Sequence, residues 1–162
     1  MAWNYNRGSA SQRMTMTRKK SHTVLLISTI ILILFFTFIV RETFEVRHVG
    51  SRGVCLTPFS ELYKLFTAQN HSFYFWQIVL NILLFIPFGF ILSCNLHIYR
   101  RTKHLFLPIL LSGLFVSISV ELLQYITSRG FTEIDDVINN TVGSIIGWLA
   151  YDRMLKAVKR KR

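Results

Sequence analysis

The chain has 162 residues, of which 51% are hydrophobic, and it nevertheless carries a formal net charge of +11. These values are compatible only if apolar and basic residues are segregated. The sequence indeed shows long apolar runs, with lysines and arginines in the tails and between the runs. This pattern is typical of a small polytopic membrane protein, and it disfavours a soluble basic protein or a nucleic-acid-binding protein with a basic face.

The first 40 residues predict a tail followed by a membrane span. Residues 1–23 contain five basic residues, no acid and no periodicity, which indicates a disordered basic cytoplasmic tail. Residues 24–40 carry no charge and would be about 25 Å long as a helix, the short end of the range for a span. A cleavable signal peptide is the alternative, but the apolar region is long for one and no small-x-small cleavage site follows. We therefore expect an uncleaved first span.

Residues 41–75 form the longest connection and predict a short helix of their own. Thr57 is expected to cap this helix with Pro58 at its first position, where the missing N–H of proline costs nothing. The helix would lie either on the membrane surface, as an amphipathic helix in the first outer loop, or packed on the protein. Its apolar face is formed by Phe59, Leu62, Tyr63 and Phe66. Residues 73–76 then give an aromatic cluster at a membrane interface.

Three further apolar runs predict the second, third and fourth spans, at residues 76–99, 105–126 and 133–151. In the second span, Pro87 removes one donor and frees the carbonyl of Leu83. This helix is therefore expected to kink, with the loose backbone facing protein or a water-lined cavity. The predicted fold class is all-α: a membrane domain of four transmembrane helices at residues 24–151, followed by a basic cytoplasmic tail at residues 152–162.

The most informative stretch, residues 130–147, opens the fourth span with three carboxylates and two adjacent asparagines. Thr132 is expected to be the N-cap with Asp135 in the first turn, so the helix should begin near Glu133. One stripe of this helix is polar and then lined by glycine. It consists of Asp136, Asn140, Gly143 and Gly147, with Asn139 beside it.

Two interpretations of this stripe are open. The acids can be a solvated cap and the glycines ordinary packing. Against this, the paired asparagines follow the stripe inward, where their burial costs free energy unless something is hydrogen-bonded to them. The spacing of Gly143 and Gly147 also lets the backbone of another helix approach closely.

The distribution of basic residues predicts the orientation. Of the 19 lysines and arginines, 14 lie in the two tails and the second connection, and 5 lie in the other two connections. Because positive charge stays on the cytoplasmic side, we expect a multi-pass cell-membrane protein with both termini inside. Cys55 and Cys94 then lie on opposite sides of the membrane, so neither a disulfide nor a metal-binding spacing is implied.

With this orientation, polar residues from three spans fall at one level near the outer surface. Glu121 lies about 24 Å from the inner start of its span, in the outer third of the membrane. A carboxylate there is costly and marks a functional site by default, whereas Asn81 can equally make an interhelical hydrogen bond. The predicted polar layer consists of Asn81, Glu121, Gln124, Asp136 and Asn140, below the Thr57-Pro58-Phe59 turn. His48 and His71 in the outer loop are weak candidates for metal ligands and are better interpreted as solvated.

Four blocks of residues together match the pattern of a known family: Leu56-Thr57-Pro58-Phe59, Asn81 with Phe85-Ile86-Pro87-Phe88-Gly89, Glu121 with Gln124, and Asp136-Val137-Ile138 with Asn140-Thr141-Val142-Gly143 and Gly147. On these blocks the chain resembles, over about residues 55–151, the VanZ-like family of small bacterial membrane proteins, which is named for an accessory protein of glycopeptide (teicoplanin) resistance. Glu133 and Ser144 are mild departures, since the resistance protein carries Asp and Gly there. The resemblance implies a multi-spanning envelope protein and supplies no biochemical activity.

Three functions are compatible with the polar layer. The first is an envelope accessory protein whose outward layer binds a lipid-linked or head-group ligand and changes how the surface presents itself to glycopeptides. The second is a membrane enzyme in which Glu121 and Asp136 act as acid and base, or hold a divalent cation, at a lipid head group. The third is a small proton-coupled transporter, which ranks last because its carboxylate should lie near the midplane.

The sequence contains no serine elbow, histidine-rich metal motif or phosphate loop. No cofactor or metal is therefore expected, and whether the chain is an enzyme stays open at this point. The expected partners are the lipid bilayer, anionic lipids at the basic tails and a lipid-linked envelope precursor, with no nucleic acid.

Overall fold

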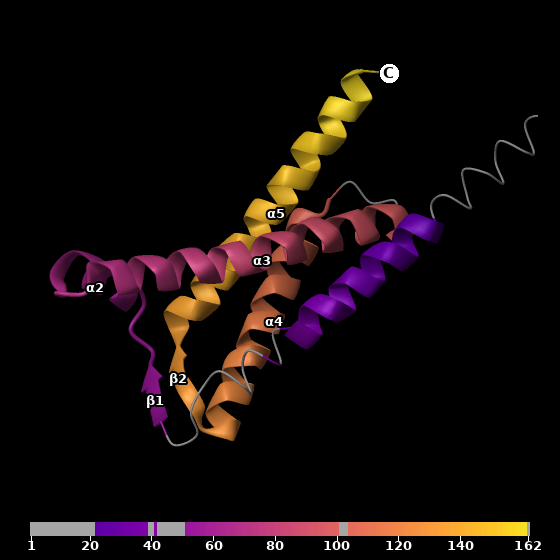
Figure 1. Ribbon diagram of the computed structural model, residues 1–162. Helices are drawn as coiled ribbons and strands as arrows, with labels where there is room; N and C mark the ends of the chain where they lie inside the picture. Colours follow the sequence, from indigo (N-terminus) through magenta and orange to yellow (C-terminus); the bar gives the residue numbers. More distant parts are fainter. Residues whose placement is uncertain (1–21, 39–40, 42–50, 101–103, 162) are drawn as a thin grey trace, which may run out of the picture.

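The computed structural model describes residues 22–38, 41, 51–100 and 104–161. It contains an N-terminal helix, His22–Phe38, followed by the labelled elements of Figure 1. These are β1 (Ser51–Cys55), α2 (Ser60–Thr67), α3 (His71–Arg100), α4 (Phe106–Thr127), β2 (Arg129–Glu133) and α5 (Ile134–Arg160). The all-α class predicted from the sequence is confirmed, with one small β pairing added. The predicted tail at residues 1–23 lies almost entirely outside the described residues.

In the described part of the chain, two helices are long and apolar enough to cross a membrane, where the sequence predicts four spans. They are α3 and α4, and they contain most of the second and third predicted spans. The N-terminal helix is apolar but shorter. Helix α5 fails the same test because its first turns carry buried acids and amides. It also runs on to Arg160, so most of the predicted C-terminal tail is helical.

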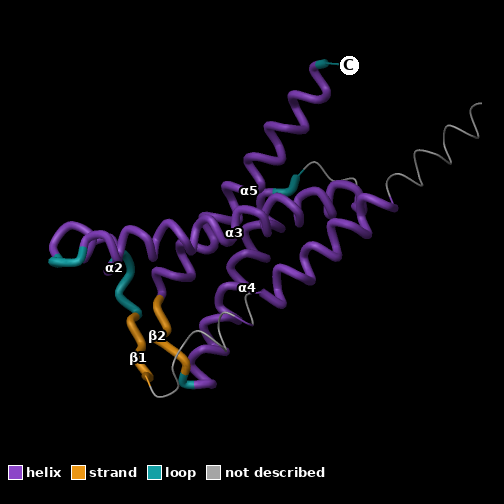
Figure 2. Tube along the Cα trace, in the orientation of Figure 1, coloured by secondary structure: helices purple, strands orange, loops and turns teal. Residues whose placement is uncertain are grey.

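Helix α5 lies between α3 and α4 and packs on both (Figure 2). Its contact with α3 is close enough to leave no room for side chains. A Cβ added to Gly143 would lie 2.3 Å from the carbonyl oxygen of Ile82, and one added to Gly147 would lie 2.1 Å from that of Ile86. From the other side, a Cβ added to Gly89 would lie 2.0 Å from the carbonyl oxygen of Ser144. The two backbones therefore touch along a seam of small residues.

Pro87 lies inside α3, which continues through it as one helix. Its ring is exposed, and Leu83, whose carbonyl loses its donor, is 53% exposed. The sequence predicted that protein or a water-lined cavity would cover this backbone. Instead, this side of α3 belongs to the outer apolar surface of the described structure.

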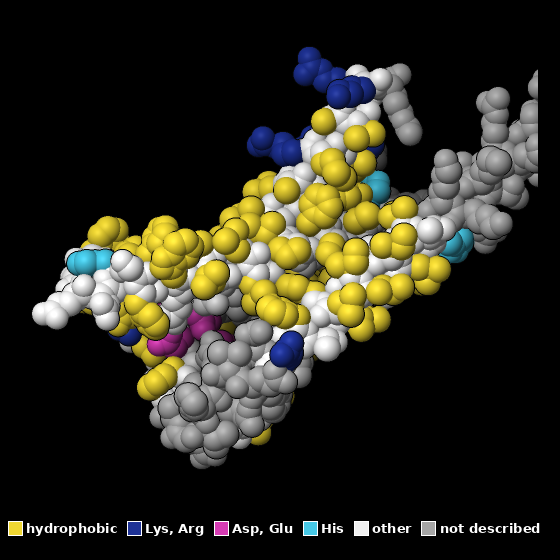
Figure 3. All heavy atoms as spheres, in the orientation of Figure 1, with side chains coloured by type: hydrophobic (Ala, Val, Ile, Leu, Met, Phe, Trp, Pro, Cys, Tyr) yellow, Lys and Arg dark blue, Asp and Glu magenta, His cyan; other side chains and the backbone are white. Residues whose placement is uncertain are grey.

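Apolar side chains remain exposed over α3, α4 and the N-terminal helix, and Figure 3 shows them covering the visible face of the molecule. The N-terminal helix packs on α3 through Phe35 and Phe88, whose rings stack with centroids 6.0 Å apart. Ser28 also donates to the side-chain oxygen of Asn95. So much exposed apolar surface is unusual for a soluble monomer, and together with the two apolar helices it suggests a membrane protein.

The sequence did not predict the two strands. β1 pairs with β2 in parallel, with Gly53 opposite Phe131 and Cys55 opposite Glu133. The Phe131 ring covers Gly53, since a Cβ added there would lie 1.9 Å from a ring carbon. Because parallel strands end at the same edge, this pairing brings together the starts of the two helices that follow, α2 and α5.

Candidate functional site

Asp135 joins the starts of α2 and α5. One of its carboxylate oxygens accepts from the backbone N–H of Phe59 at 2.6 Å. The other accepts from the N–H of Glu61 at 2.7 Å and from the hydroxyl of Ser60 at 3.0 Å. A carboxylate is favourable at a helix N-terminus because it satisfies free N–H groups and faces the positive end of the dipole. Thus Asp135 lies in the first turn of α5 as predicted, but it caps α2.

Both caps predicted from the sequence are wrong. Helix α2 begins at Ser60, after Phe59 with a left-handed φ of 62°, so Thr57 and Pro58 precede the helix and are exposed. Thr132 belongs to β2, and its hydroxyl donates to the carbonyl oxygen of Glu121 at 3.3 Å. For α2, a residue distant in sequence, Asp135, supplies the acceptor that Thr57 was expected to provide.

Glu121 acts on the start of α5. Its carboxylate accepts from the backbone N–H of Glu133 at 3.0 Å, and Glu133 is the residue just before the helix. Glu121 is only 4% exposed. Glu121, which belongs to α4, therefore stabilises the junction between β2 and α5.

Helix α2 turns its polar face toward the protein and its apolar face outward. Glu61 is 1% exposed, whereas Phe66 is 75% exposed. Leu62 and Tyr63, on the same apolar face as Phe66, are exposed as well. Helix α2 is thus packed on the protein through its polar face, which leaves its apolar face exposed. Whether this exposed face lies on a membrane surface stays a prediction.

A cluster of carboxylates and amides lies where α2, α3 and α5 meet. Each of three carboxylates accepts a hydrogen bond from one amide: Gln77 donates to Glu133 at 2.9 Å, Asn139 donates to Glu61 at 2.9 Å, and Asn81 donates to Asp136. Carboxylate oxygens of Glu61, Glu133 and Asp136 all lie within 4.8 Å of one another. We call these residues the acid–amide cluster: Glu61, Gln77, Asn81, Glu133, Asp136 and Asn139.

The surroundings of Glu61 in the cluster favour its neutral, protonated form. Burial is the main cause that raises the pKa of Glu61 from 4.5 to about 8, and the neighbouring charges of Asp136, Glu133 and Asp135 raise it further, with a hydrogen bond to Glu133. With a pKa of about 8, this carboxyl is mostly protonated at neutral pH, and the carboxylates of Asp136, Glu133 and Asp135 lie around it.

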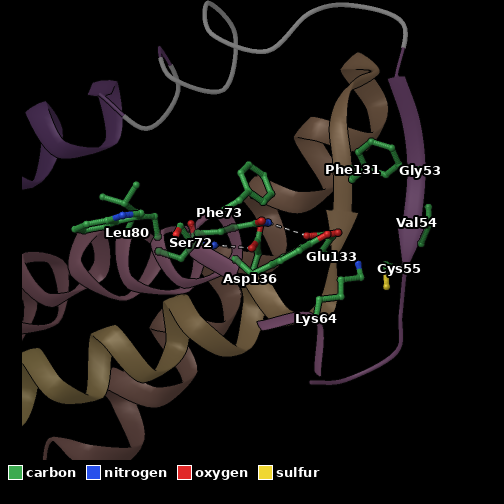
Figure 4. Close-up of a pocket in the computed structure, with 14 residues that line it drawn as sticks. Gly53, Val54, Cys55, Lys64, Ser72, Phe73, Leu80, Phe131, Glu133 and Asp136 are labelled. Atoms are coloured by element: carbon green, nitrogen blue, oxygen red, sulfur yellow. Dashed lines mark hydrogen bonds between the residues drawn. The ribbon is translucent and has the colours of Figure 1, made fainter. Parts of the chain in front are cut away.

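A pocket of about 1150 Å³ opens beside the cluster. Asn81, Glu133 and Asp136 form part of its wall, with Lys64 close by. Figure 4 shows Glu133 and Asp136 side by side, with dashed lines marking the amide hydrogen bonds. Most of the remaining wall is apolar or aromatic and includes Phe73, Tyr74, Trp76, Leu80 and Phe131. The wall of the pocket thus combines carboxylates with aromatic and apolar side chains.

The residues of the predicted polar layer gather around the first turns of α5, but on two sides of it. Asn81 and Asp136 line the pocket. Glu121, Gln124 and Asn140 do not line it; they are buried. On that side Asn140 donates to the hydroxyl of Ser117 in α4 at 2.9 Å. Of the five residues of the predicted polar layer, two therefore line the pocket and three are buried away from it.

The two histidines considered as metal ligands do not join this group. The Nδ1 atom of His71 lies 2.6 Å from the carbonyl oxygen of Leu65, in an exposed contact that ties α3 to α2. His48 lies outside the described residues. The two cysteines are free, in β1 and α3.

Four members of the acid–amide cluster lie outside the polar layer predicted from the sequence: Glu61, Gln77, Glu133 and Asn139. Glu61 offered one usable signal, because it is an acid opposite the apolar face of a short amphipathic helix that covers the polar layer. Asn139 was noticed only as a neighbour of the polar stripe. Gln77 and Glu133 had no periodic signal, since their positions depend on how α3 and β2 meet.

Comparison with known proteins gives the family. A model of the VanZ/LLP1 family matches residues 22–156. The protein VanZ of Enterococcus faecium is 34% identical over 111 residues, which are 68% of this chain and 60% of that protein. The chain thus matches less than two thirds of the length of that relative. No solved structure matches the chain. The resemblance seen in the sequence is confirmed, and the chain belongs to the VanZ/LLP1 family.

Proposed function

We propose that this chain is a VanZ-like integral membrane protein of the cell envelope that contributes to resistance against glycopeptides such as teicoplanin. Its polar end would hold the head group of a lipid or of a lipid-linked envelope precursor. The observation that carries this proposal is the acid–amide cluster, in which Glu61 and Asp136 are buried, beside an open pocket at the edge of a large apolar surface.

The chemistry of the pocket supports a head-group ligand. Tryptophan and tyrosine, here Trp76 and Tyr74, are enriched at the interface between lipid and water. The floor offers the carboxylates of Glu133 and Asp136, and Lys64 adds a positive group at the wall. Amines, hydroxyls and phosphates of a head group can all find a counterpart among these side chains.

The proposal includes four spans with both termini in the cytoplasm. The N-terminal helix and α5 would be the additional spans. The acids and amides of α5 that lower its hydropathy are turned into the bundle, as Asp136 at 3% and Asn140 at 5% exposure illustrate, so lipid does not have to solvate them. In Figure 3, basic side chains gather at the C-terminal end of α5, whereas acidic ones lie near α2. This separation supports the predicted orientation.

A membrane enzyme acting on a lipid head group is the second candidate, and Glu61 favours it. The pKa of this carboxyl is raised to about 8, so it could supply a proton to a head group, and carboxylate oxygens of Glu133 and Asp136 lie within 4.8 Å of it. A proton-coupled transporter is not favoured, because the acid–amide cluster lies at the start of α5 and not at its middle.

The proposal is tested with Glu133→Gln and Asp136→Asn, two residues of the pocket wall, in cells that depend on this chain for teicoplanin resistance. Both replacements keep an oxygen that can accept the observed hydrogen bonds from Gln77 and Asn81. We therefore expect nearly normal protein levels and loss of the resistance. The matched control is Asp152→Asn in α5, which removes a half-buried carboxylate paired with Lys156 and should leave resistance unchanged.

Normal resistance at normal protein levels in both variants would reject the proposal, and so would a loss that only follows the amount of protein. A profile of lipids and wall precursors in cells with and without the chain separates the two candidates. A changed ratio of products selects the enzyme. An unchanged profile with altered antibiotic binding selects the accessory role.

A further inference from the structure

We propose that the acid–amide cluster binds one hard divalent cation, such as Ca²⁺ or Mg²⁺, with carboxylate oxygens of Glu61, Glu133 and Asp136 as its protein ligands. The inference concerns the site of the proposed function but does not rest on it, since a cation needs only these side chains and water.

The three carboxylates converge from different elements. Glu61 comes from α2, Glu133 from the end of β2 and Asp136 from the first turn of α5. One oxygen of each lies within 4.8 Å of the others. Calcium–oxygen bonds are about 2.3–2.6 Å long, so two ligands on opposite sides of the ion are about 5 Å apart. The cluster is therefore already as compact as one coordination shell.

A buried oxygen of Glu61 points independently to a ligand. Glu61 is 1% exposed. Its Oε2 accepts from Asn139, whereas Oε1 has no hydrogen-bond donor among the described residues. In the deprotonated carboxylate, this buried oxygen would have neither a donor nor a cation, which is costly. A cation between Glu61 and its two partner carboxylates would satisfy this oxygen.

The amides of the cluster would act as its supporting shell. Gln77 and Asn81 from α3, and Asn139 from α5, each donate to one of the three carboxylates. Such hydrogen bonds fix the orientation of metal ligands and are usual around metal sites. Neutral amides orient the carboxylates but do not compensate their charge.

The donor set selects the class of cation. Carboxylate oxygens favour Ca²⁺, Mg²⁺ and Mn²⁺ over metals that prefer sulfur or imidazole.

The ammonium of Lys64 lies 5.6 Å from the centre of the Tyr74 ring, where it makes a cation–π contact. Glu133 and Asp136 line the open pocket. Waters or a phosphate can therefore reach the ion from the pocket and complete its coordination.

The test is a titration of the full chain, purified in detergent and freed of metal with a chelator. Mn²⁺ is followed by its paramagnetic resonance spectrum, and Ca²⁺ and Mg²⁺ are added as competitors. We expect saturable binding of one ion per chain, with a dissociation constant of about 10⁻⁴ M or below, the range in which protein Ca²⁺ sites of moderate affinity bind. The unfolding temperature should rise with Ca²⁺ and not with choline chloride of equal ionic strength.

Glu133→Gln and Glu61→Gln should each weaken binding by about tenfold or more, whereas Asp152→Asn, at the other end of α5, should bind as the native chain does. Glu133 is half-buried, so its variant is expected to fold even if the Glu61 variant does not. Non-saturable binding to the native chain, or equal affinity in the native chain and Glu133→Gln, would overturn the cation site. Such a result would leave the resistance experiment untouched, because that experiment measures susceptibility without reference to a metal.

Discussion

At the scale of single residues, Asp135 shows how a side chain can serve a helix other than its own. It is 4% exposed, and it receives three hydrogen bonds from the start of α2 although it belongs to α5. The family resemblance includes Thr57, Pro58 and Phe59. The structure gives the last of these a role, because its backbone N–H is one of the three donors.

Asp135→Ala should therefore destabilise the protein through α2. The substitution leaves the N–H groups of Phe59 and Glu61 without their acceptor, and the latter bond is buried. Each unsatisfied buried group costs about 1–3 kcal/mol, so we expect the free energy of unfolding in detergent to fall by about 2 kcal/mol or more. Thr57→Ala is the control: this exposed residue precedes the helix, so its replacement should change stability by about 0.5 kcal/mol or less. A larger effect at Thr57 than at Asp135 would contradict the observed capping.

At the scale of elements, the contact between α3 and α5 depends on glycine. Gly147 lies against the backbone of α3, where an added Cβ would be 2.1 Å from a carbonyl oxygen. Backbone atoms cannot rotate away as a side chain can, so a larger residue must separate the helices. This explains why α5 can be central to the bundle although α3 and α4 are more apolar.

Gly147→Leu should accordingly impair assembly far more than Ile146→Leu, because Ile146 is 38% exposed on the other side of the helix. Overpacking a tight contact costs about 1–3 kcal/mol and more where backbone is involved, whereas the exchange of Ile for Leu at an exposed site is nearly neutral. The measurement is the fraction of each variant that elutes as folded, monodisperse protein in detergent. Equal yields would show that the seam tolerates side chains.

At the scale of the whole molecule, the structure divides into a polar end and a basic end. The strands, α2 and the start of α5 lie together at one end, and the C-terminus of α5 lies away from them (Figure 1). An apolar surface formed by α3, α4 and the N-terminal helix lies between these ends. We expect the polar end to face outward, since the basic residues gather at the other.

Reporter fusions at residue 70 and after Arg162 test this orientation. A phosphatase that is active only outside the cytoplasm should be active at residue 70 and inactive after Arg162, and a fluorescent protein that folds only inside should give the opposite pattern. An active phosphatase after Arg162 would reverse the orientation and place the acid–amide cluster on the cytoplasmic side.

What the sequence by itself determined is which segments are apolar helices and which residues share one helix face. Apolar runs indicated α3 and α4, and the 3.6-residue period of a helix placed Asp136, Asn140, Gly143 and Gly147 on one face of α5. All four are buried in the structure. Positions three or four residues apart share a helix face wherever the helix lies. Which residues share a face can therefore be predicted without knowledge of the fold. The motif blocks that carry the family resemblance are local in the same way.

What only the tertiary structure decided depends on contacts between distant segments. Asp135 reaches the N–H of Glu61 across 74 positions of sequence, because a short parallel pairing aligns Cys55 with Glu133. No periodicity within either segment indicates that the two strands pair. Local sequence alone therefore predicts Thr57 and Thr132 as caps. The same pairing turns Glu61 inward and gathers three carboxylates within 4.8 Å. The chemistry proposed for this end of the molecule therefore arises from the parallel alignment of two strands that carry no sequence signal of their own.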